Sequence, residues 1–372
     1  RPHTREYLEA IKIYDEVAKL YPNTPQAEEA MLRHGLTLTL YGFYKKAIDV
    51  LENFTDTYPK NIYVSRNIIQ ENIDENIKGL INNFFRSGDN FSLLGIYNDY
   101  KTKYLLNFRF DISLFQTAVA HRKLGFFEEA IDLLNFIENK SSGTIKELAQ
   151  FEKAQIHFEK DDFVEARSII VQFLKNFPKS AYDPESRKLL ALIYKKQNAF
   201  KRAVIVYEQA IDKYEKSNDY ILSEIVPEFY FDLAKLHEEN GDYNDAANSY
   251  RKTILRYSHP LDNNKTPEYI VRSIFLEAEM NYKAKNFELA LANYNRAISL
   301  YSDSKNKETI DNVFWSKFQV GTIYKNQGKL NKALEIFKDL KEEKGQKIFN
   351  KLAEENYREI SNTLDYSNYV ED

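Results

Sequence analysis

The sequence predicts an all-α protein, a solenoid of stacked antiparallel helix pairs. Three observations lead to this class: a short phrase recurs along the chain, each copy begins an amphipathic helix, and glycine and proline stand at fixed places between helices. With 372 residues the chain is long enough for two or three compact domains or for one extended array. The self-similarity favours the array, because a fixed repeat period is the signature of stacked units.

The recurring phrase is an aromatic residue or leucine, an alanine three positions later, and a bulky apolar residue four positions after that. It reads YLEAIKIY, YKKAIDVL, FEEAIDLL, FVEARSII, FKRAVIVY, YNDAANSY, FELALANY and LNKALEIF. A degenerate copy, NFSLLGIY, has Leu93 at the alanine position. Up to Ala203 the anchors are 36 or 37 residues apart, except for one interval of 46; beyond it they are 43 or 44 apart. The anchor alanines are Ala10, Ala47, Ala130, Ala166, Ala203, Ala246, Ala290 and Ala333.

Each phrase predicts the second helix of a pair, and the segment before it predicts the first. One first helix, 185–196, carries its apolar residues as a single stripe at Leu189, Leu190, Ile193 and Tyr194. Between the helices, glycine suits a left-handed turn five residues before the anchor, at Gly42, Gly88, Gly125, Gly241 and Gly328. Proline ends the second helix, as at Tyr58-Pro59 and Phe177-Pro178. A small anchor residue lets the paired helices cross closely.

With these residues the chain resembles the tetratricopeptide repeat (TPR) family over nearly its whole length. The family has a small residue midway through each first helix, matched here by Gly35, Ala191, Ala234, Ala278 and Gly321. Its aromatic residue near the end of that helix is matched by Tyr194 and Tyr324. The resemblance implies a right-handed superhelix whose concave wall, made by the first helices, receives peptides or partner helices. The junctions YPNTPQAEEA and FPKSAYDPES look most like those of bacterial cell-envelope members.

The repeat lengths predict four segments. Residues 1–24 are a partial first repeat without its first helix, and 25–214 are an N-terminal TPR array of about 36–37-residue repeats, one of them degenerate. Residues 215–345 are a C-terminal TPR array of about 43–44-residue repeats, and 346–372 are a capping helix and tail. We expect the additional residues of the longer repeats to form loops at 258–268 and 302–311, which are polar and rich in turn formers.

Aromatic residues on the first helices are the candidate binding residues. Five phenylalanines lie 15 residues before their anchors, at a station that in the family faces the concave wall or its edge. One interpretation is that they grip an apolar partner helix or peptide. The other is that they pack against the neighbouring repeat, and the sequence leaves both open. The partner-binding candidates are Phe115, Phe151, Phe231, Phe275, Trp315 and Phe318.

No set of catalytic, metal-binding or cofactor-binding residues is expected in the chain. There is no cysteine, and the motifs of hydrolases, zinc proteases, and nucleotide-binding or dinucleotide-binding loops are absent from the sequence. His121, His157 and His237 share one repeat position, but equivalent positions in stacked repeats lie too far apart to ligate one ion. We therefore expect aromatic-like packing of these histidines, and no catalytic residue, metal or cofactor.

Charge and hydropathy limit the partners. Lysine and arginine number 52 against 56 acidic residues, and the two signs are interleaved, which argues against nucleic acid as the partner. Apolar runs fall short of the roughly 20 residues that span a bilayer, so no direct membrane span is expected. The chain opens with Arg1-Pro2-His3 rather than Met, which predicts a fragment whose natural start lies upstream.

The predicted function is a non-enzymatic scaffold or adaptor that binds partner proteins on its concave face. The composition alone excludes no compartment. We expect a bacterial cell-envelope assembly and a periplasmic or envelope-associated location, with the cytoplasm as the alternative. An alternative function is a structural subunit of a larger periplasmic machine, for example around the flagellar motor or a secretion system. Such a subunit would oligomerise through array ends and loops. A more distant alternative is the accessory repeat domain of an enzyme.

Overall fold

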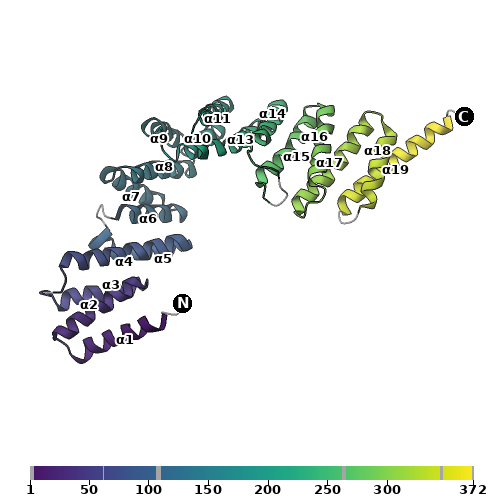
Figure 1. Cartoon of the computed structure of the whole chain (residues 1–372). Helices are drawn as coiled ribbons and strands as arrows, with labels where there is room; N and C mark the ends of the chain where they lie inside the picture. Colours follow the sequence, from purple (N-terminus) through teal and green to yellow (C-terminus); the bar gives the residue numbers. More distant parts are fainter. Residues whose placement is uncertain (1–3, 62, 106–109, 262–264, 344–346, 371–372) are drawn as a thin grey trace. The chain divides into compact units, whose positions relative to one another are not determined.

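The computed structural model describes residues 4–61, 63–105, 110–261, 265–343 and 347–370 (Figure 1). These residues are helical or lie in short connections, with no strand among them, which confirms the predicted all-α class. The chain divides into two compact units, Arg1–Leu189 and Leu190–Asp372, here called unit 1 and unit 2. The predicted division at residue 214 rests on repeat length, a different criterion, and stays a prediction.

First and second helices alternate along the chain. The first helices are α2 (Pro25–Leu40), α4 (Arg66–Ser87), α6 (Asp111–Lys123), α8 (Thr144–Glu159), α10 (Asp183–Lys196), α13 (Val226–Asn240), α15 (Glu268–Lys283) and α17 (Lys307–Asn326). The second helices are α1 (Thr4–Leu20), α3 (Tyr44–Thr57), α5 (Asn90–Tyr100), α7 (Phe127–Lys140), α9 (Phe163–Asn176), α11 (Phe200–Glu215), α14 (Tyr243–Arg256), α16 (Phe287–Tyr301) and α18 (Leu330–Glu342). A short helix, α12 (Tyr220–Glu224), and a terminal helix, α19 (Lys347–Val370), complete the set.

Helix packing follows the order of the chain within each unit. In unit 1, for example, α2 packs against α1 and α3, and in unit 2, α14 packs against α13 and α15. First helices also touch the first helix of the next repeat, as α4 touches α6 and α15 touches α17. Each unit is therefore a double layer in which the first helices form one side and the second helices the other (Figure 1).

The anchor residues lie where the two helices of a pair meet. Seven of the eight anchor alanines are fully buried, and Leu93 of the degenerate copy is buried as well. Ala10 on α1 is half-buried. The small station midway along the first helix has the same role: a Cβ added to Gly35 would lie 2.6 Å from the Leu51 side chain. Close helix crossing therefore explains both small positions of the repeat.

The turn between the helices has a left-handed residue five positions before the anchor. Its φ is +80° at Gly42 and +82° at Gly241. Three repeats lack glycine there, and Asp161, Asn198 and Lys285 adopt the same conformation with φ of 58°, 55° and 64°. Because the backbone is constrained by helices on both sides, the turn keeps its shape even where a side chain makes that shape unfavourable.

The longer repeats of unit 2 use their additional residues in three different ways. Between α11 and α13 they form α12, and between α14 and α15 they form a connection that includes part of 258–268. The expected loop at 302–311 is wrong for its second half, because α17 begins at Lys307. Asn306 caps this helix by accepting a hydrogen bond from the Thr309 amide, so residues 307–311 add a turn to α17 instead of a loop.

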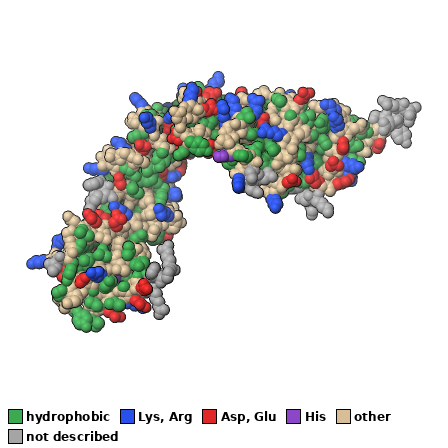
Figure 2. Space-filling view, viewed as in Figure 1, with side chains coloured by type: hydrophobic (Ala, Val, Ile, Leu, Met, Phe, Trp, Pro, Cys, Tyr) green, Lys and Arg blue, Asp and Glu red, His purple; other side chains and the backbone are tan. Residues whose placement is uncertain are grey.

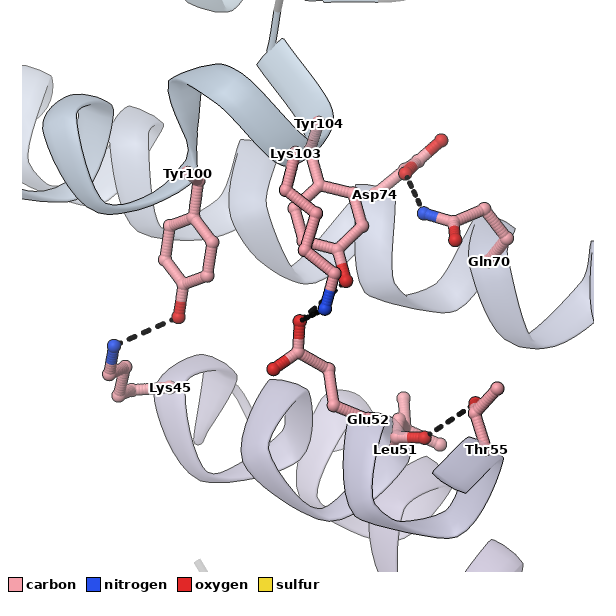
Figure 3. Close-up of polar contacts among 9 residues, drawn as sticks. All are labelled: Lys45, Leu51, Glu52, Thr55, Gln70, Asp74, Tyr100, Lys103 and Tyr104. Atoms are coloured by element: carbon pink, nitrogen blue, oxygen red, sulfur yellow. Dashed lines mark hydrogen bonds and ion pairs between the residues drawn. The ribbon is translucent and has the colours of Figure 1, made fainter. Parts of the chain in front are cut away.

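The irregular 46-residue interval, from Ala47 to Leu93, contains the long first helix α4. The second helix that follows α4 is short and continues into a π-helical turn. Ser65 caps α4 at its start, and Gly88 ends it in the left-handed conformation. The second helix α5 stops at Tyr100 and continues as the π-helical segment Lys101–Leu105. This segment faces α3, as Figure 3 shows.

Polar contacts hold the π-helical segment to α3 (Figure 3). Lys103 Nζ donates to Glu52 Oε1 at 2.7 Å, and the Tyr104 hydroxyl donates to the same oxygen. About two turns earlier on α3, Lys45 Nζ donates to the Tyr100 hydroxyl at 2.9 Å. Burial opposes ionisation of Glu52, but the bonds from Lys103 and Tyr104 outweigh it and lower its pKa. Burial, followed by the bond to Glu52, raises the pKa of Tyr104 to about 12.

Replacing Glu52 should weaken unit 1 in a pH-dependent way. Since folding lowers the pKa of Glu52, its stabilisation is present above the unfolded value of about 4.3 and is lost as pH falls through the folded value. We expect Glu52→Gln to cost about 1–2 kcal/mol near neutral pH and to approach wild type in acid. Urea unfolding across pH 3–7 measures this, with the exposed Glu71→Gln as the control. An offset that is constant with pH would contradict it.

Two glycine-to-alanine changes in unit 1 should have opposite effects. At Gly35 the new methyl group would overlap Leu51, and such overpacking costs about 1–3 kcal/mol. At Gly95, on α5, a Cβ meets no atom within 4 Å, so Gly95→Ala should stabilise by up to about 1 kcal/mol through helix propensity. Urea unfolding midpoints should move in opposite directions. Equal destabilisation by both changes would contradict the explanation that Gly35 is small because two helices cross closely there.

Candidate partner-binding surfaces

Three of the five candidate phenylalanines are buried between helices. Phe151 and Phe231 are each 9% exposed, and Phe275 is 7% exposed. Each packs on aromatic rings that follow it in the chain, with ring centroids 5.7–6.4 Å apart. These pairs are Phe151 with Phe173 and Tyr182, Phe231 with Tyr250 and Tyr269, and Phe275 with Tyr301.

The other two phenylalanines are half-buried. Phe115 packs against the core of unit 1, and Phe318 meets Phe337 edge to face with ring centroids 5.4 Å apart. The structure thus gives the phenylalanine stripe a packing role between helices. Its role as a partner-binding stripe stays a prediction, and the two half-buried members are Phe115 and Phe318.

Trp315 is the accessible member of the candidate set. It is the only tryptophan of the chain, and 37% of it is exposed. Its ring stacks on Phe318 with centroids 5.8 Å apart and lies 6.3 Å from the ring of Phe349. Its indole Nε1 donates to Glu279 Oε2 at 3.2 Å. Residues of α15, α17 and α19 therefore hold this indole in place on the first-helix side.

Charged pairs border the same face. Glu279 Oε2 also accepts from the Tyr294 hydroxyl at 2.7 Å, which fixes the carboxylate that holds Trp315. About two turns away along the same helices, Arg272 of α15 lies 4.0 Å from Glu308 of α17. Figure 2 shows basic and acidic side chains interspersed on the face that it draws. The exposed indole thus shares helices α15 and α17 with charged side chains.

Grooves lie on the other side, between successive second helices. Each is floored by the first helix that stands between them: α5 and α7 over α6, α11 and α14 over α13, and α14 and α16 over α15. Their volumes are about 610, 340 and 360 Å³ respectively. The sequence analysis missed these grooves, because helical periodicity shows which residues are exposed but not how far neighbouring second helices stand apart.

At the shared histidine position, His121 and His237 pack as aromatic rings, as expected, whereas Nδ1 of His157 lies 3.2 Å from Asp162 Oδ2. His121 lies edge to face with Tyr97 and Phe126, and burial, its main influence, lowers its pKa. His237 meets Phe200 in the same way, with centroids 5.7 Å apart. Among the described residues, no group of three or more His, Cys, Asp or Glu side chains is placed to hold a metal ion.

Comparison with known proteins identifies the class of fold. A family model for the soluble NSF attachment protein (SNAP) matches residues 171–285, a minority of the chain. No curated protein matches it. The apo form of RapI superposes with a TM-score of 0.55 at 11% identity, covering 91% of this chain and 98% of its own. The C-terminal part of a TPR repeat-containing protein from Cytophaga hutchinsonii gives 0.55 at 14% identity, covering 74% and 97%.

These likenesses show a TPR-like helical repeat fold and confirm the predicted solenoid class. At such identities they show the fold alone. Among the described residues, none of the helices combines the length and the hydrophobicity that a bilayer span requires.

Burial separates the two kinds of candidate residue by their effect on stability. Phe231→Ala should cost unit 2 about 3–5 kcal/mol, because it leaves a cavity beside Tyr250 and Tyr269. Trp315→Ala removes a partly exposed ring and should lower the melting temperature much less. Calorimetry of both variants measures the difference. If Phe231→Ala melted at the same temperature as the wild type, packing of Phe231 would not stabilise unit 2, and Phe231 would again be a candidate binding residue.

Proposed function

We propose that this protein is a non-enzymatic scaffold that binds a partner protein on the first-helix face of α15, α17 and α19, centred on Trp315. The observation that carries the proposal is the rigid, accessible indole, stacked on Phe318 and hydrogen-bonded to Glu279. The TPR-like fold supports it, because stacked helix pairs present one extended face to a partner.

The physical basis of this proposal is the conformational entropy that a side chain loses when it binds a partner. Tryptophan is enriched at binding hot spots because a large flat ring gains apolar contact and loses little conformational freedom. Here that freedom is already lost in the free protein, since Phe318, Phe349 and Glu279 hold the ring. A partner side chain that covers the exposed edge of Trp315 therefore binds a preorganised surface.

We infer further that the scaffold works in a bacterial cell-envelope assembly, in the periplasm or associated with the envelope. The support is the junction sequences around Tyr21-Pro22 and Phe177-Pro178, which resemble those of cell-envelope members of the TPR family. Protein partners, and not nucleic acid, fit a surface on which the two charge signs are interspersed (Figure 2).

A second candidate function is a structural subunit that assembles through its ends. The observation that favours it is the apolar surface of α1, where Leu8 is 44% exposed, Ile13 55% and Leu20 70%. Apolar side chains grouped on one exposed helix are typical of an interface. In this alternative the Trp315 face would contribute nothing to assembly.

Comparative capture with matched variants tests the proposal. Wild-type protein, Trp315→Ala and Leu255→Ala are immobilised in equal amounts, exposed to lysate of the source cells, crosslinked and read by quantitative mass spectrometry. Leu255 is 69% exposed on α14 and serves as the control for loss of a surface apolar side chain. We expect one or more proteins that wild type and Leu255→Ala retain and crosslink near α15–α19, and that Trp315→Ala reduces about tenfold, equivalent to about 1.4 kcal/mol.

The same data can reject the proposal. An identical set of captured proteins on all three baits would exclude the Trp315 face. Crosslinks from α1 to a second copy, with no change in Trp315→Ala, would favour the structural subunit.

A further inference from the structure

The groove between α14 and α16 differs from the other grooves in its chemistry. It has a volume of about 360 Å³ and is lined by five asparagines, two arginines and one glutamate, with an alanine and a leucine. It lies on the second-helix side, because Glu277 and Asn281 of α15 line it, whereas Glu279 of the same helix turns to Trp315. It is therefore a separate site from the proposed scaffold face.

Two rows of side chains face each other across the groove. On α14, Asn244, Asn248 and Arg251 are spaced i, i+4 and i+7, one face of a helix. On α16 and the residue before it, the row is Asn286, Asn293 and Arg296. In both rows an arginine follows an asparagine by three positions.

The register of the two rows explains why they converge. Arg251 is five residues after its anchor Ala246, whereas Arg296 is six residues after its anchor Ala290. One residue turns a helix by about 100°. The same Asn-x-x-Arg pair therefore faces forward from α14 and backward from α16, into the common groove.

Existing hydrogen bonds order the walls. The Asn286 side-chain amide donates to Asn244 Oδ1 at 2.8 Å and so links the two rows at one end. Arg251 Nη2 donates to Asn248 Oδ1 at 3.0 Å, which orients its guanidinium and uses one of five N–H donors. Both arginines are exposed, so their remaining donors reach the groove without a burial cost.

The floor is buried and polar. Glu277 is 5% exposed and Asn281 is 6% exposed. Burial raises the pKa of Glu277, against the opposing charges of Arg296 and Arg251 and a hydrogen bond with Asn293. The lining therefore has two arginines against one acid that burial makes reluctant to ionise, which leaves an excess of positive charge.

We propose that this groove binds an extended acidic peptide segment of a partner protein, with a carboxylate between Arg251 and Arg296 and the peptide main chain on the asparagines. An asparagine side chain offers one acceptor and two donors, which matches the N–H and C=O of a peptide unit. The planar fork of arginine matches a carboxylate. Leu289, 57% exposed among the lining residues, gives an apolar side chain of the peptide a place to pack.

The lining favours a peptide over a nucleic acid. None of its residues is aromatic, so no ring is present to stack an unpaired base. The two arginines are exposed, so they can hold a single carboxylate at the rim of the groove.

A selection with matched variants tests this site. Wild-type protein is screened against a phage-displayed library of random dodecapeptides, and the enriched peptide is synthesised with a fluorescent label for polarisation titrations. We expect Asp or Glu in the enriched peptide. Affinity should fall about tenfold or more, equivalent to about 1.4 kcal/mol, in Arg251→Gln/Arg296→Gln and when the acidic residue of the peptide becomes its amide.

The control is Arg256→Gln/Arg272→Gln, which removes the same charge from α14 and α15 outside the groove lining and should bind as wild type does. If Arg251→Gln/Arg296→Gln melts at a lower temperature than the wild type, Arg251→Lys/Arg296→Lys is tested in its place. It keeps the positive charge but lacks the planar guanidinium, and it must also bind the peptide more weakly than the wild type does. No enriched peptide, enrichment of neutral peptides alone, or unchanged affinity in the groove variants overturns the proposal, as does displacement of the peptide by single-stranded RNA. Because Trp315→Ala leaves this groove intact, failure here is distinguishable from failure of the scaffold proposal.

Discussion

The close crossing of the two helices in each repeat is the constraint on which the rest of the structure depends. The fully buried anchor alanines and the glycine or alanine midway along the first helix let the two backbones approach. Gly35 shows how little space is left at such a crossing, because a single methyl group there would overlap the Leu51 side chain. Once the pair is this close, larger side chains above and below the crossing must pack against the next repeat. The double layer of each unit follows.

Aromatic residues fill the space between those crossings, and this explains their abundance. Several tyrosines bury the ring and give the hydroxyl to a carboxylate of another helix: Tyr250 to Glu238 at 2.8 Å, and Tyr294 to Glu279 at 2.7 Å. Burial is the main influence raising the pKa of both tyrosines, followed by the adjacent carboxylate charge and hydrogen bond. Each pair satisfies two polar groups at an otherwise apolar contact, so a tyrosine can occupy a position where phenylalanine would leave the carboxylate without a partner.

The two sides of unit 2 offer different chemistry to a partner. The first-helix side presents a fixed indole, which suits an apolar contact, and the second-helix side presents asparagines and arginines, which suit a polar main chain and a carboxylate. Helix α15 belongs to both, since Glu279 supports Trp315 while Glu277 and Asn281 floor the groove. A repeat array can carry such separate sites because every first helix has one edge on each side.

The sequence by itself determined the helix pairs, their anchors and their left-handed turns, because these depend on residue spacing along single helices and on small residues at fixed stations. It also singled out Trp315 and Phe318, but it left packing and binding open for the phenylalanines. Only the tertiary structure decided that Phe231 and Phe275 are buried, since their cover, Tyr269 and Tyr301, comes from other helices. The groove of α14 and α16 likewise required the tertiary structure, because a one-residue difference in register acquires meaning only when two helices lie side by side.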